Sequence, residues 1–315
     1  MGLTLPAALR AFEPALPAAV AFSGGADSTA LLVAAARAWP GQVHAIHVHH
    51  GLQPAADDFA RHCGGVCERL GVRLHQVEVD ARHQPGESPE DAARKARYAA
   101  LAQAASSQGL KAVWLAHHAD DQVETLLLAL SRGAGLPGLA AMPARFERHG
   151  MRFERPLLGV PAPAIRDWLR AEALDFVEDP TNADRSFTRN RIRHELLPAL
   201  EKAFPQFRET FARSARHAAQ AQRVLSSVAA EDLGRTGNPP AIRVLRSLDR
   251  ARQANLLRHW LITAHRMRAN AAQLEELLNQ VEACATRGHD IRMKVGTGFV
   301  ARDGECLRFR PHLDA

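Results

Sequence analysis

The sequence contains few aromatic residues, few cysteines and no long apolar run. Aromatic side chains make up 5% of the 315 residues, and the four cysteines include no CxxC pair. Because so few cysteines exclude a secreted disulfide scaffold, we expect reduced, structural thiols at Cys63, Cys67, Cys284 and Cys306. No stretch reaches the roughly 18 uninterrupted apolar residues of a membrane span, and the N-terminus lacks a basic region followed by an apolar one. We therefore expect a cytoplasmic protein without a membrane segment.

A second absence concerns nucleotide binding. The chain has no GxxxxGK(S/T) segment and therefore lacks the phosphate-binding lysine of conventional ATPases and GTPases. Instead, the segment SGGADS lies between an apolar run and a helix-like stretch. Its glycines allow a tight turn and a close approach of the backbone to phosphate, and its serines add hydroxyl donors. A plain capped turn between a strand and a helix is the alternative interpretation.

Asp27 is the unexpected residue of this segment, because a carboxylate repels phosphate unless a divalent cation lies between them. The free N–H groups at the start of the helix and the helix dipole attract the phosphate, and the carboxylate would bind Mg²⁺. We therefore expect a nucleotide site with Mg²⁺ at Asp27, formed by Ser23, Gly24, Gly25, Ala26, Asp27 and Ser28.

The order of the expected elements predicts an α/β fold. Strands are expected at 18–22, 43–48, 74–79 and 112–115, alternating with helices at 27–39, 57–70, 89–107 and 120–132. This alternation predicts a Rossmann-like parallel sheet of the five-stranded type with helices on both faces and ligands at the carboxyl ends of the strands. The Gly/Pro-rich stretch 133–138 is expected to be a loop. Further helices are expected at 166–172, 189–200, 206–230, 249–265 and 271–283, and β structure at 290–295, 299–302 and 305–310.

Positive charge is concentrated in the C-terminal part of the chain. Residues 1–184 carry 17 Lys and Arg against 21 Asp and Glu, whereas residues 185–315 carry 23 against 13. We expect a catalytic domain at 1–204 and a mainly helical, basic domain with a short β tail at 205–315 that binds a polyanion. A solvated, Arg-rich helical surface explains the charge equally well.

Four histidines around the second expected strand resemble a metal site, but adjacent strand residues point to opposite faces. His44, His47, His49 and His50 are therefore better explained without a metal, with His49 at the edge of a nucleotide pocket. Arg94 and Arg97, three residues apart on one helix, form a fork suited to phosphates, and surface arginines are the alternative.

Two carboxylates at the start of the fourth expected helix share a face. Asp121 and Glu124 would either complement the helix dipole or, if they face the strand ends, hold a cationic substrate or Mg²⁺. A later polar turn leads into a helix with three arginines in five positions, the last of them Arg193, and that density suits polyphosphate or RNA.

Taken in order, these segments resemble a known family. SGGADS resembles the SGGxDS loop of the ATP-pyrophosphatase (PP-loop) superfamily. Together with HVHHGL, ARKARY, LAHHADDQVET, RGAGLPGL and EDPTNADRSFTRNRIRHELLP, it resembles the tRNA(Ile)-lysidine synthetase family over most of residues 18–200. The resemblance is less distinct over 205–315, and the chain ends where longer members continue, so it resembles a short form or a truncated one.

The resemblance implies a ligase that uses ATP and Mg²⁺ to adenylate the carbon 2 oxygen of the wobble cytidine in tRNA(Ile) with the anticodon CAU. The ε-amine of free L-lysine then attacks that carbon, giving lysidine, AMP and pyrophosphate. Arg94, Arg97, Arg193 and Asp27 would act on the phosphates, and Asp121 and Glu124 on the lysine amine.

Two other functions are compatible with the sequence. A tRNA cytidine thiolase of the same superfamily would use cysteine pairs, which this chain lacks. A non-catalytic nucleotide- or RNA-binding module is the second, although the intact Asp27, Asp121 and Glu124 argue against lost catalysis. The oligomeric state stays open, a homodimer included.

Overall fold

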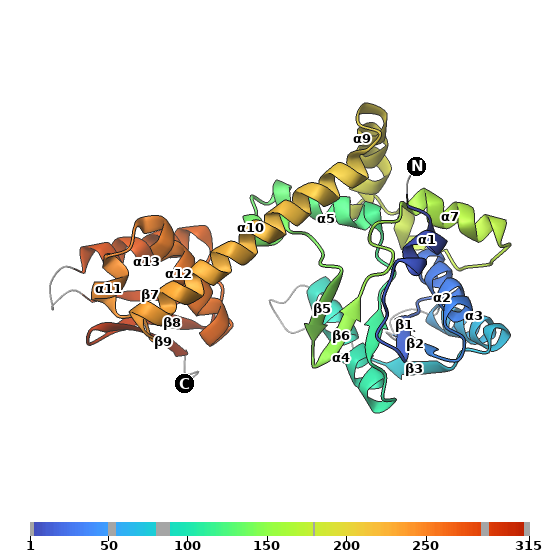
Figure 1. The fold of residues 1–315 in the computed structure, drawn as a ribbon, viewed down its shortest axis with the longest axis horizontal. Helices are drawn as coiled ribbons and strands as arrows, with labels where there is room; N and C mark the ends of the chain where they lie inside the picture. Colours follow the sequence, from blue (N-terminus) through green and yellow to red (C-terminus); the bar gives the residue numbers. More distant parts are fainter. Residues whose placement is uncertain (1–2, 50–54, 80–88, 179, 285–289, 312–315) are drawn as a thin grey trace. The chain divides into compact units, whose positions relative to one another are not determined.

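The computed structural model describes residues 3–49, 55–79, 89–178, 180–284 and 290–311 (Figure 1). The chain divides into two compact units, Met1–Ala218 and Ala219–Ala315, which are described separately. None of the described helices is both long and apolar enough to cross a membrane.

The first unit is built on a six-stranded sheet with the order β3-β2-β1-β4-β6-β5. Its strands are β1 (Ala18–Ala21), β2 (Val43–His49), β3 (Leu74–Glu78), β4 (Ala112–Trp114), β5 (Arg145–Arg148) and β6 (Met151–Glu154). Five of them are parallel, and β5 alone pairs in the antiparallel sense, with β6. The expected α/β class with a mainly parallel sheet is confirmed.

The sequence predicted a parallel sheet and did not predict the β5–β6 hairpin. The prediction was wrong in this respect, because β5 is an antiparallel edge strand. The strands are joined by His149 and Gly150, whose φ angles of 51° and 71° are those of a two-residue hairpin turn. Charged residues alternate with apolar ones in RFER and MRFE, so neither strand forms the apolar run typical of a central parallel strand.

Helices cover both faces of the sheet, as expected. The side chains of β1 alternate: Ala18 and Val20 enter the core shared with α1 (Leu5–Arg10), α2 (Ala26–Ala38), α3 (Ala55–Leu70) and α7 (Ala162–Ala171). Ala19 instead enters the core on the other face, which is covered by α4 (Pro89–Ser107). This period of two is why a strand of small and apolar residues is buried on both sides.

A small helical layer follows the sheet. Val123 on α5 (Ala119–Ser131) packs with Phe207, the first residue of α10 (Phe207–Thr236), and with Ile192 and Leu197 from the segment after the sheet. That segment consists of η1 (Pro180–Ala183), α8 (Thr188–Arg191), the π-helical turn η2 (Ile192–Leu196) and α9 (Leu197–Ala203), where one helix at 189–200 was expected. The expected loop 133–138 is partly helical, since α6 spans Leu136–Leu139.

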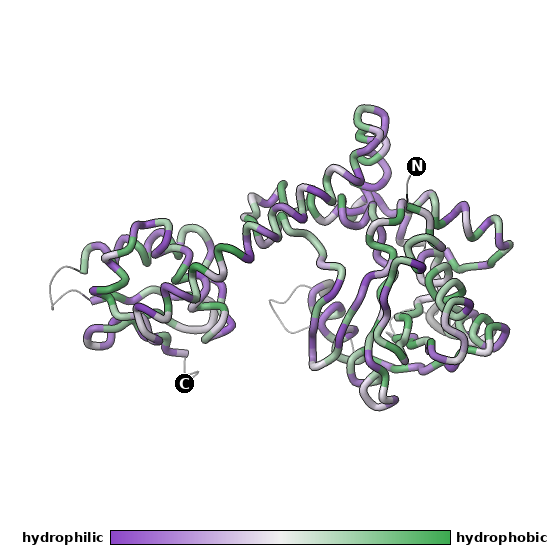
Figure 2. The backbone as a smooth tube through the Cα atoms, viewed as in Figure 1, coloured by the Kyte–Doolittle hydropathy of each residue, from purple (hydrophilic) through white to green (hydrophobic). Residues whose placement is uncertain are grey.

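The second unit contains the C-terminal part of α10 (Phe207–Thr236), α11 (Ile242–Arg246), α12 (Arg250–His265) and α13 (Ala271–Ala283). Their apolar side chains share a core with a three-stranded antiparallel sheet of β7 (Arg292–Val295), β8 (Gly298–Asp303) and β9 (Cys306–Pro311). Hydrophobic and hydrophilic residues alternate along α10, as Figure 2 shows, which is typical of a helix that is only partly covered.

None of the four cysteines forms a disulfide, in agreement with the expected reduced thiols. Burial raises the pKa of Cys63 to about 12 and that of Cys67 to about 11. Both groups are therefore protonated and unreactive at neutral pH, because the thiolate is the nucleophile.

Candidate active site

The SGGADS segment joins the carboxyl end of β1 to the start of α2. Gly24 has a φ of +83°, and a Cβ there would lie 3.1 Å from Sγ of Cys63 on α3. Both the conformation and the space therefore require glycine at this position. Gly25 is the N-cap of α2 and no side chain caps the helix, so its first N–H groups are available to an anion.

The two serines of the segment have different surroundings. Ser28 is buried; its hydroxyl donates to the carbonyl of Gly25 at 3.0 Å and accepts the N–H of Ser23 at 3.2 Å. Ser23 is exposed, and its Oγ lies 3.0 Å from Oγ of Ser28. Ser28 thus holds the loop in shape, whereas Ser23 is the more exposed of the two residues.

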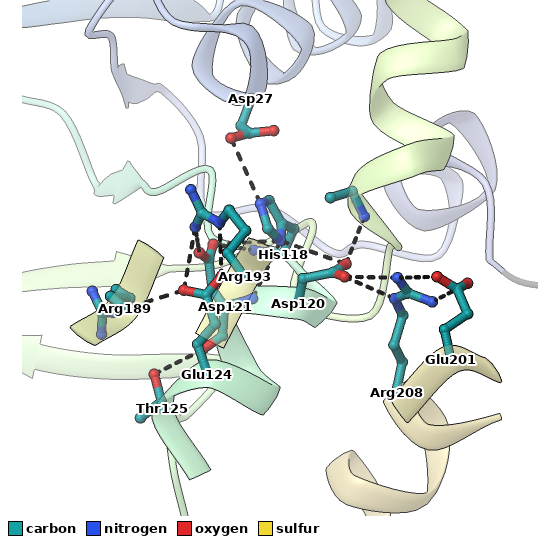
Figure 3. Close-up of polar contacts among 11 residues, drawn as sticks. Asp27, His118, Asp120, Asp121, Glu124, Thr125, Arg189, Arg193, Glu201 and Arg208 are labelled. Atoms are coloured by element: carbon teal, nitrogen blue, oxygen red, sulfur yellow. Dashed lines mark hydrogen bonds and ion pairs between the residues drawn. The ribbon is translucent and has the colours of Figure 1, made fainter. Parts of the chain in front are cut away.

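His118 lies between Asp27 of the SGGADS segment and the carboxylates at the start of α5 (Figure 3). It is the N-cap of α5 and 3% exposed, and its Nε2 lies 3.6 Å from Oδ2 of Asp27. On the other side of the ring, its Nδ1 lies 3.3 Å from the N of Asp121 and 3.5 Å from Oδ2 of the same residue. His118 was not predicted as a site residue from the sequence. A histidine directly before a helix whose third residue is acidic could have indicated that it caps the helix.

The charges around His118 favour its protonated form. Burial lowers the pKa of His118, but the hydrogen bond to Asp27 and the charges of Asp121, Asp27 and Asp120 outweigh burial and raise it to about 9. The neutral ring accepts the N–H of Asp121, and the protonated ring forms ion pairs with Asp27 and Asp121. Burial raises the pKa of Asp27, but the hydrogen bond and charge of His118 together with the charges of Arg166 and Arg193 outweigh burial and lower it, which favours the ionised carboxylate.

The neighbouring His117 is in the opposite state. Burial lowers the pKa of His117 to about 4; the charges of Arg155 and Arg97 act in the same direction, and that of Asp121 opposes it. The buried Arg155 donates from Nε to Nδ1 of His117 at 3.3 Å, which requires a neutral acceptor.

Asp121 and Glu124 do lie together on one face of α5, and both contact Arg193. Glu124 is fully buried and accepts Nε of Arg193 at 2.8 Å and Nη2 at 3.2 Å, while Nη2 also lies 3.3 Å from Oδ1 of Asp121. Nε of Arg189 lies 3.7 Å from Oε2 of Glu124. Arg189 and Arg193 thus extend from the same side of the α8–η2 segment (Figure 3).

Burial disfavours the charged forms of Glu124 and Arg193, and the hydrogen bonds between them oppose this effect. Burial raises the pKa of Glu124, and the charge and hydrogen bonds of Arg193 oppose this. Burial lowers the pKa of Arg193, but the charge and hydrogen bonds of Glu124 together with the charges of Asp121 and Asp27 outweigh burial, and the net shift is upward. Arg193 belongs to the π-helical turn η2, and such wide turns are frequent at functional sites.

Asp120, the remaining acid at this helix start, has a structural role. It is buried, accepts the N–H of Ala162 at 2.8 Å and pairs with Arg208, whose Nε is 2.9 Å away. Arg208 also donates to Glu201. Asp120 therefore joins α5 to α7 and α10 and is not available to a ligand.

The other expected residues lie at varying distances from this centre. The charge of Arg97 lowers the pKa of His117, and Arg97 makes no ion pair with a described residue. Arg94 lies one turn earlier on α4, with its guanidinium 6.0 Å from the centre of the Tyr98 ring. His49 is at the carboxyl end of β2, its ring 6.5 Å from that of His47. Arg166 on α7, whose charge lowers the pKa of Asp27, was not expected from the sequence.

The described histidines of β2 have partners other than a metal ion. His47 donates from Nδ1 to the carbonyl of Phe22 at 2.8 Å, and His44 pairs with His75. His50 lies outside the described residues. Among those that are described, no group of three or more His, Cys, Asp or Glu side chains could hold a metal ion.

A mainly parallel sheet whose first strand runs through an SGGxDS turn into an uncapped helix defines the PP-loop class of nucleotide-binding domain. In agreement, the family model of the PP-loop domain matches residues 8–200, and that of the TilS substrate binding domain matches residues 241–312. A solved structure, the U34-tRNA thiolase NcsA from Methanococcus maripaludis with its [4Fe-4S] cluster, shares the fold. Its TM-score is 0.56 at 16% identity, over 65% of this chain and 73% of that chain.

The relatives narrow the class. The tRNA(Ile)-lysidine synthase of Polaromonas naphthalenivorans is 65% identical over 292 residues, which cover 93% of this chain and 89% of the relative. The tRNA(Ile)-lysidine synthase of Burkholderia mallei is 42% identical over 298 residues, and these cover 92% of this chain but 60% of that relative. The chain belongs to the tRNA(Ile)-lysidine synthase family, ligases that form a carbon–nitrogen bond, and the thiolase alternative is not favoured.

Proposed function

We propose that this chain uses ATP to join free L-lysine to the wobble cytidine of tRNA(Ile) with the anticodon CAU, forming lysidine, AMP and pyrophosphate. The observation that carries the proposal is the link from Asp27 through His118 to Asp121. It joins a phosphate-binding loop to a pair of carboxylates, the two features that an ATP-dependent reaction with an amine requires.

ATP is proposed to bind at the SGGADS segment. The free N–H groups at the start of α2 and the hydroxyl of the exposed Ser23 suit phosphate oxygens. Arg94 and Arg97, together with His49 at the pocket edge, are proposed to complete this site.

The residues present also fit Mg²⁺. Asp27 is 37% exposed and contacts His118 through one oxygen, which leaves the other for a cation. Mg²⁺ commonly binds to one or two carboxylates together with substrate phosphates, where it neutralises charge on the phosphate oxygens.

The lysine ammonium is proposed to bind to Asp121 and Glu124. In the structure these carboxylates are occupied by Arg193, so the ammonium would share them with the guanidinium or replace it. One of the carboxylates would also help to remove the amine proton. Arg193 and Arg97 are proposed to stabilise negative charge during adenylation.

The tRNA is proposed to contact the basic C-terminal part of the chain. We propose that residues 1–204 form the catalytic domain and residues 205–315 the tRNA-binding domain. We also propose that the protein acts in the cytoplasm. A homodimer stays a prediction.

The test is incubation of the chain with ATP, Mg²⁺, labelled lysine and unmodified tRNA(Ile) or tRNA(Met), both with the anticodon CAU. We expect label in tRNA(Ile) alone and none with the Asp27→Asn variant. Pyrophosphate release with and without tRNA separates an active enzyme from a non-catalytic module. Label in neither tRNA, under conditions in which ATP binds, contradicts the proposal.

A further inference from the structure

The three-stranded sheet of the second unit has one apolar and one strongly basic face. Val295, Val300 and Leu307 are buried in the core against α11, α12 and α13. The alternate positions carry exposed cations, Arg292 and Lys294 on β7 and Arg308 and Arg310 on β9. Because successive strand residues point to opposite faces, all four belong to the face turned away from the core.

The register places these cations on both sides of β8, the middle strand. Ala301 lies between Arg292 and Arg308, and Phe299 lies opposite Arg310. The guanidinium of Arg292 is 4.9 Å from the centre of the Phe299 ring. The small side chain of Ala301 leaves room between the arginines.

A cleft of about 440 Å³ lies on this face of the sheet. Its lining includes Arg292, Phe299, Ala301 and Arg310 of this face. Asp290 also lines it, as does Arg302, which has the register of the core-facing residues and donates to Sγ of Cys284. Clefts of about 300 to 1,000 Å³ are large enough for a small organic ligand, and one nucleotide is of that size. The cleft therefore combines space, an aromatic ring and the guanidinium groups of Arg292 and Arg310, with one carboxylate at Asp290.

The charge on this face is only partly neutralised. Asp303 lies 3.0 Å from Nε of Arg308 and 4.0 Å from Nη2 of Arg310, so two cations share one carboxylate. On the helical side of the same unit, by contrast, Arg250 pairs with two glutamates and Arg252 has Asp232 to itself. Like charges held together on a surface destabilise it unless an anion binds.

The chemistry of the face distinguishes between polyanions. Phosphate suits guanidinium groups, and a base stacks on an aromatic ring or on a guanidinium plane, so a cleft that offers both matches an unpaired nucleotide. An acidic peptide would use the arginines but not the ring.

From these contacts we infer that the basic face of β7, β8 and β9 binds single-stranded RNA, with one unpaired base against Phe299 and the adjoining phosphates on Arg292 and Arg310. The inference rests on the proposed function in that the RNA is a tRNA, whose unpaired nucleotides supply the base. It assigns this contact to a particular surface of the unit.

The experiment measures binding of the full chain to unmodified tRNA(Ile) by fluorescence anisotropy at several salt concentrations. Phe299→Leu, which keeps an apolar side chain but removes the ring, should weaken binding about tenfold, and Phe299→Trp should retain it. Arg310→Gln should weaken binding and reduce the slope of log affinity against log salt by about 1. The matched control is Arg258→Gln, which removes an exposed arginine from α12. Thermal unfolding checks that each variant is folded.

Three outcomes overturn the inference. The first is wild-type affinity in folded Phe299→Leu and Arg310→Gln variants, and the second is an equal loss in Arg258→Gln. The third is competition by polyglutamate as strong as that by single-stranded RNA of equal charge, which would mark a docking face for an acidic protein.

Lysidine formation by the same samples separates this inference from the proposed function. If the wild type makes no lysidine but the variants lose RNA binding as expected, the proposed function fails and the RNA-binding face stands. If lysidine forms and the variants bind tRNA as the wild type does, the reverse holds.

Discussion

Nε2 of His118 lies 3.6 Å from Oδ2 of Asp27, which ties the start of α5 to the SGGADS segment at the start of α2. Through Nδ1 the same ring contacts Asp121 in the first turn of α5: the neutral ring accepts its N–H, and the protonated ring pairs with its carboxylate. One buried side chain thus makes two separable contacts, one with the carboxylate of Asp27 and one with the first turn of α5.

His118→Asn and His118→Ala should separate these two contacts. Asparagine is a good N-cap but is too short to reach Asp27, so both variants lose the ion pairs of His118 and should be less stable than the wild type. Alanine should cost about 1 kcal/mol more than asparagine, because it also lacks the cap. Both should lose most of the ATP-dependent activity because Asp27 is no longer held. Urea unfolding and lysidine formation measure the two effects. Full activity in the asparagine variant would show that the contact with Asp27 does not matter.

The ion pair between Glu124 and Arg193 should contribute to the stability of the first unit. Removing one partner of a fully buried pair costs about 3–5 kcal/mol, but Arg193 is 35% exposed and Arg189 remains 3.7 Å from Glu124. We therefore expect Arg193→Ala to lower the free energy of unfolding by about 1–2 kcal/mol.

Two variants control this prediction. Arg189→Ala, which removes the more distant cation, should cost less than 1 kcal/mol. Combining Arg193→Ala with Glu124→Gln should restore part of the loss, because the buried carboxylate is then no longer charged without a partner. Additive losses in the double variant would contradict a direct interaction.

Glu124→Gln alone tests the proposed lysine site. The amide keeps the shape of the side chain but not its charge, so attraction for an ammonium is lost while the phosphate loop is unchanged. We expect the KM for lysine to rise at least tenfold and the KM for ATP to stay within twofold. Glu201→Gln, which removes an exposed carboxylate bonded to Arg208, serves as the matched control and should leave both constants unchanged. An equal rise in both KM values would point to a distorted site instead.

Local patterns predicted most of the sheet and its helices, because burial of strands and amphipathic helices leaves a periodic signal in neighbouring residues. α4 and α13, for example, have the expected bounds of 89–107 and 271–283. The β5–β6 hairpin lacked this signal. Its charged side chains form ion pairs that depend on the folded sheet. Arg145 and Arg152 both pair with Glu154, which is fully buried and also accepts the indole N–H of Trp114.

The candidate site could be predicted only where its residues are close in sequence. The turn at Ser23–Ser28 and the shared face of Asp121 and Glu124 follow from spacing. The contact of His118 with Asp27 and the occupation of both carboxylates by Arg193 join distant segments, and no local pattern encodes them.

The contact between His44 on β2 and His75 on β3 makes the stability of the first unit depend on pH. Nδ1 of His44 lies 3.0 Å from Nε2 of His75, so one ring donates its N–H to the lone pair of the other. Burial lowers the pKa of both rings, and the charge of the nearby Arg73 acts in the same direction. With folded pKa values below the unfolded value of about 6.5, the unfolded chain binds protons first as the pH falls. The contribution of the pair to stability is therefore complete above pH 6.5 and is lost progressively below it.

We expect the free energy of unfolding, measured in urea between pH 8 and pH 5, to fall less steeply in a His44→Asn, His75→Asn variant than in the wild type. The double substitution is the informative one, because a single asparagine leaves a ring that still titrates. His217→Asn, at an exposed histidine of α10, should leave the slope unchanged. An unaltered slope in the double variant would mean that the two rings do not resist protonation in the folded state.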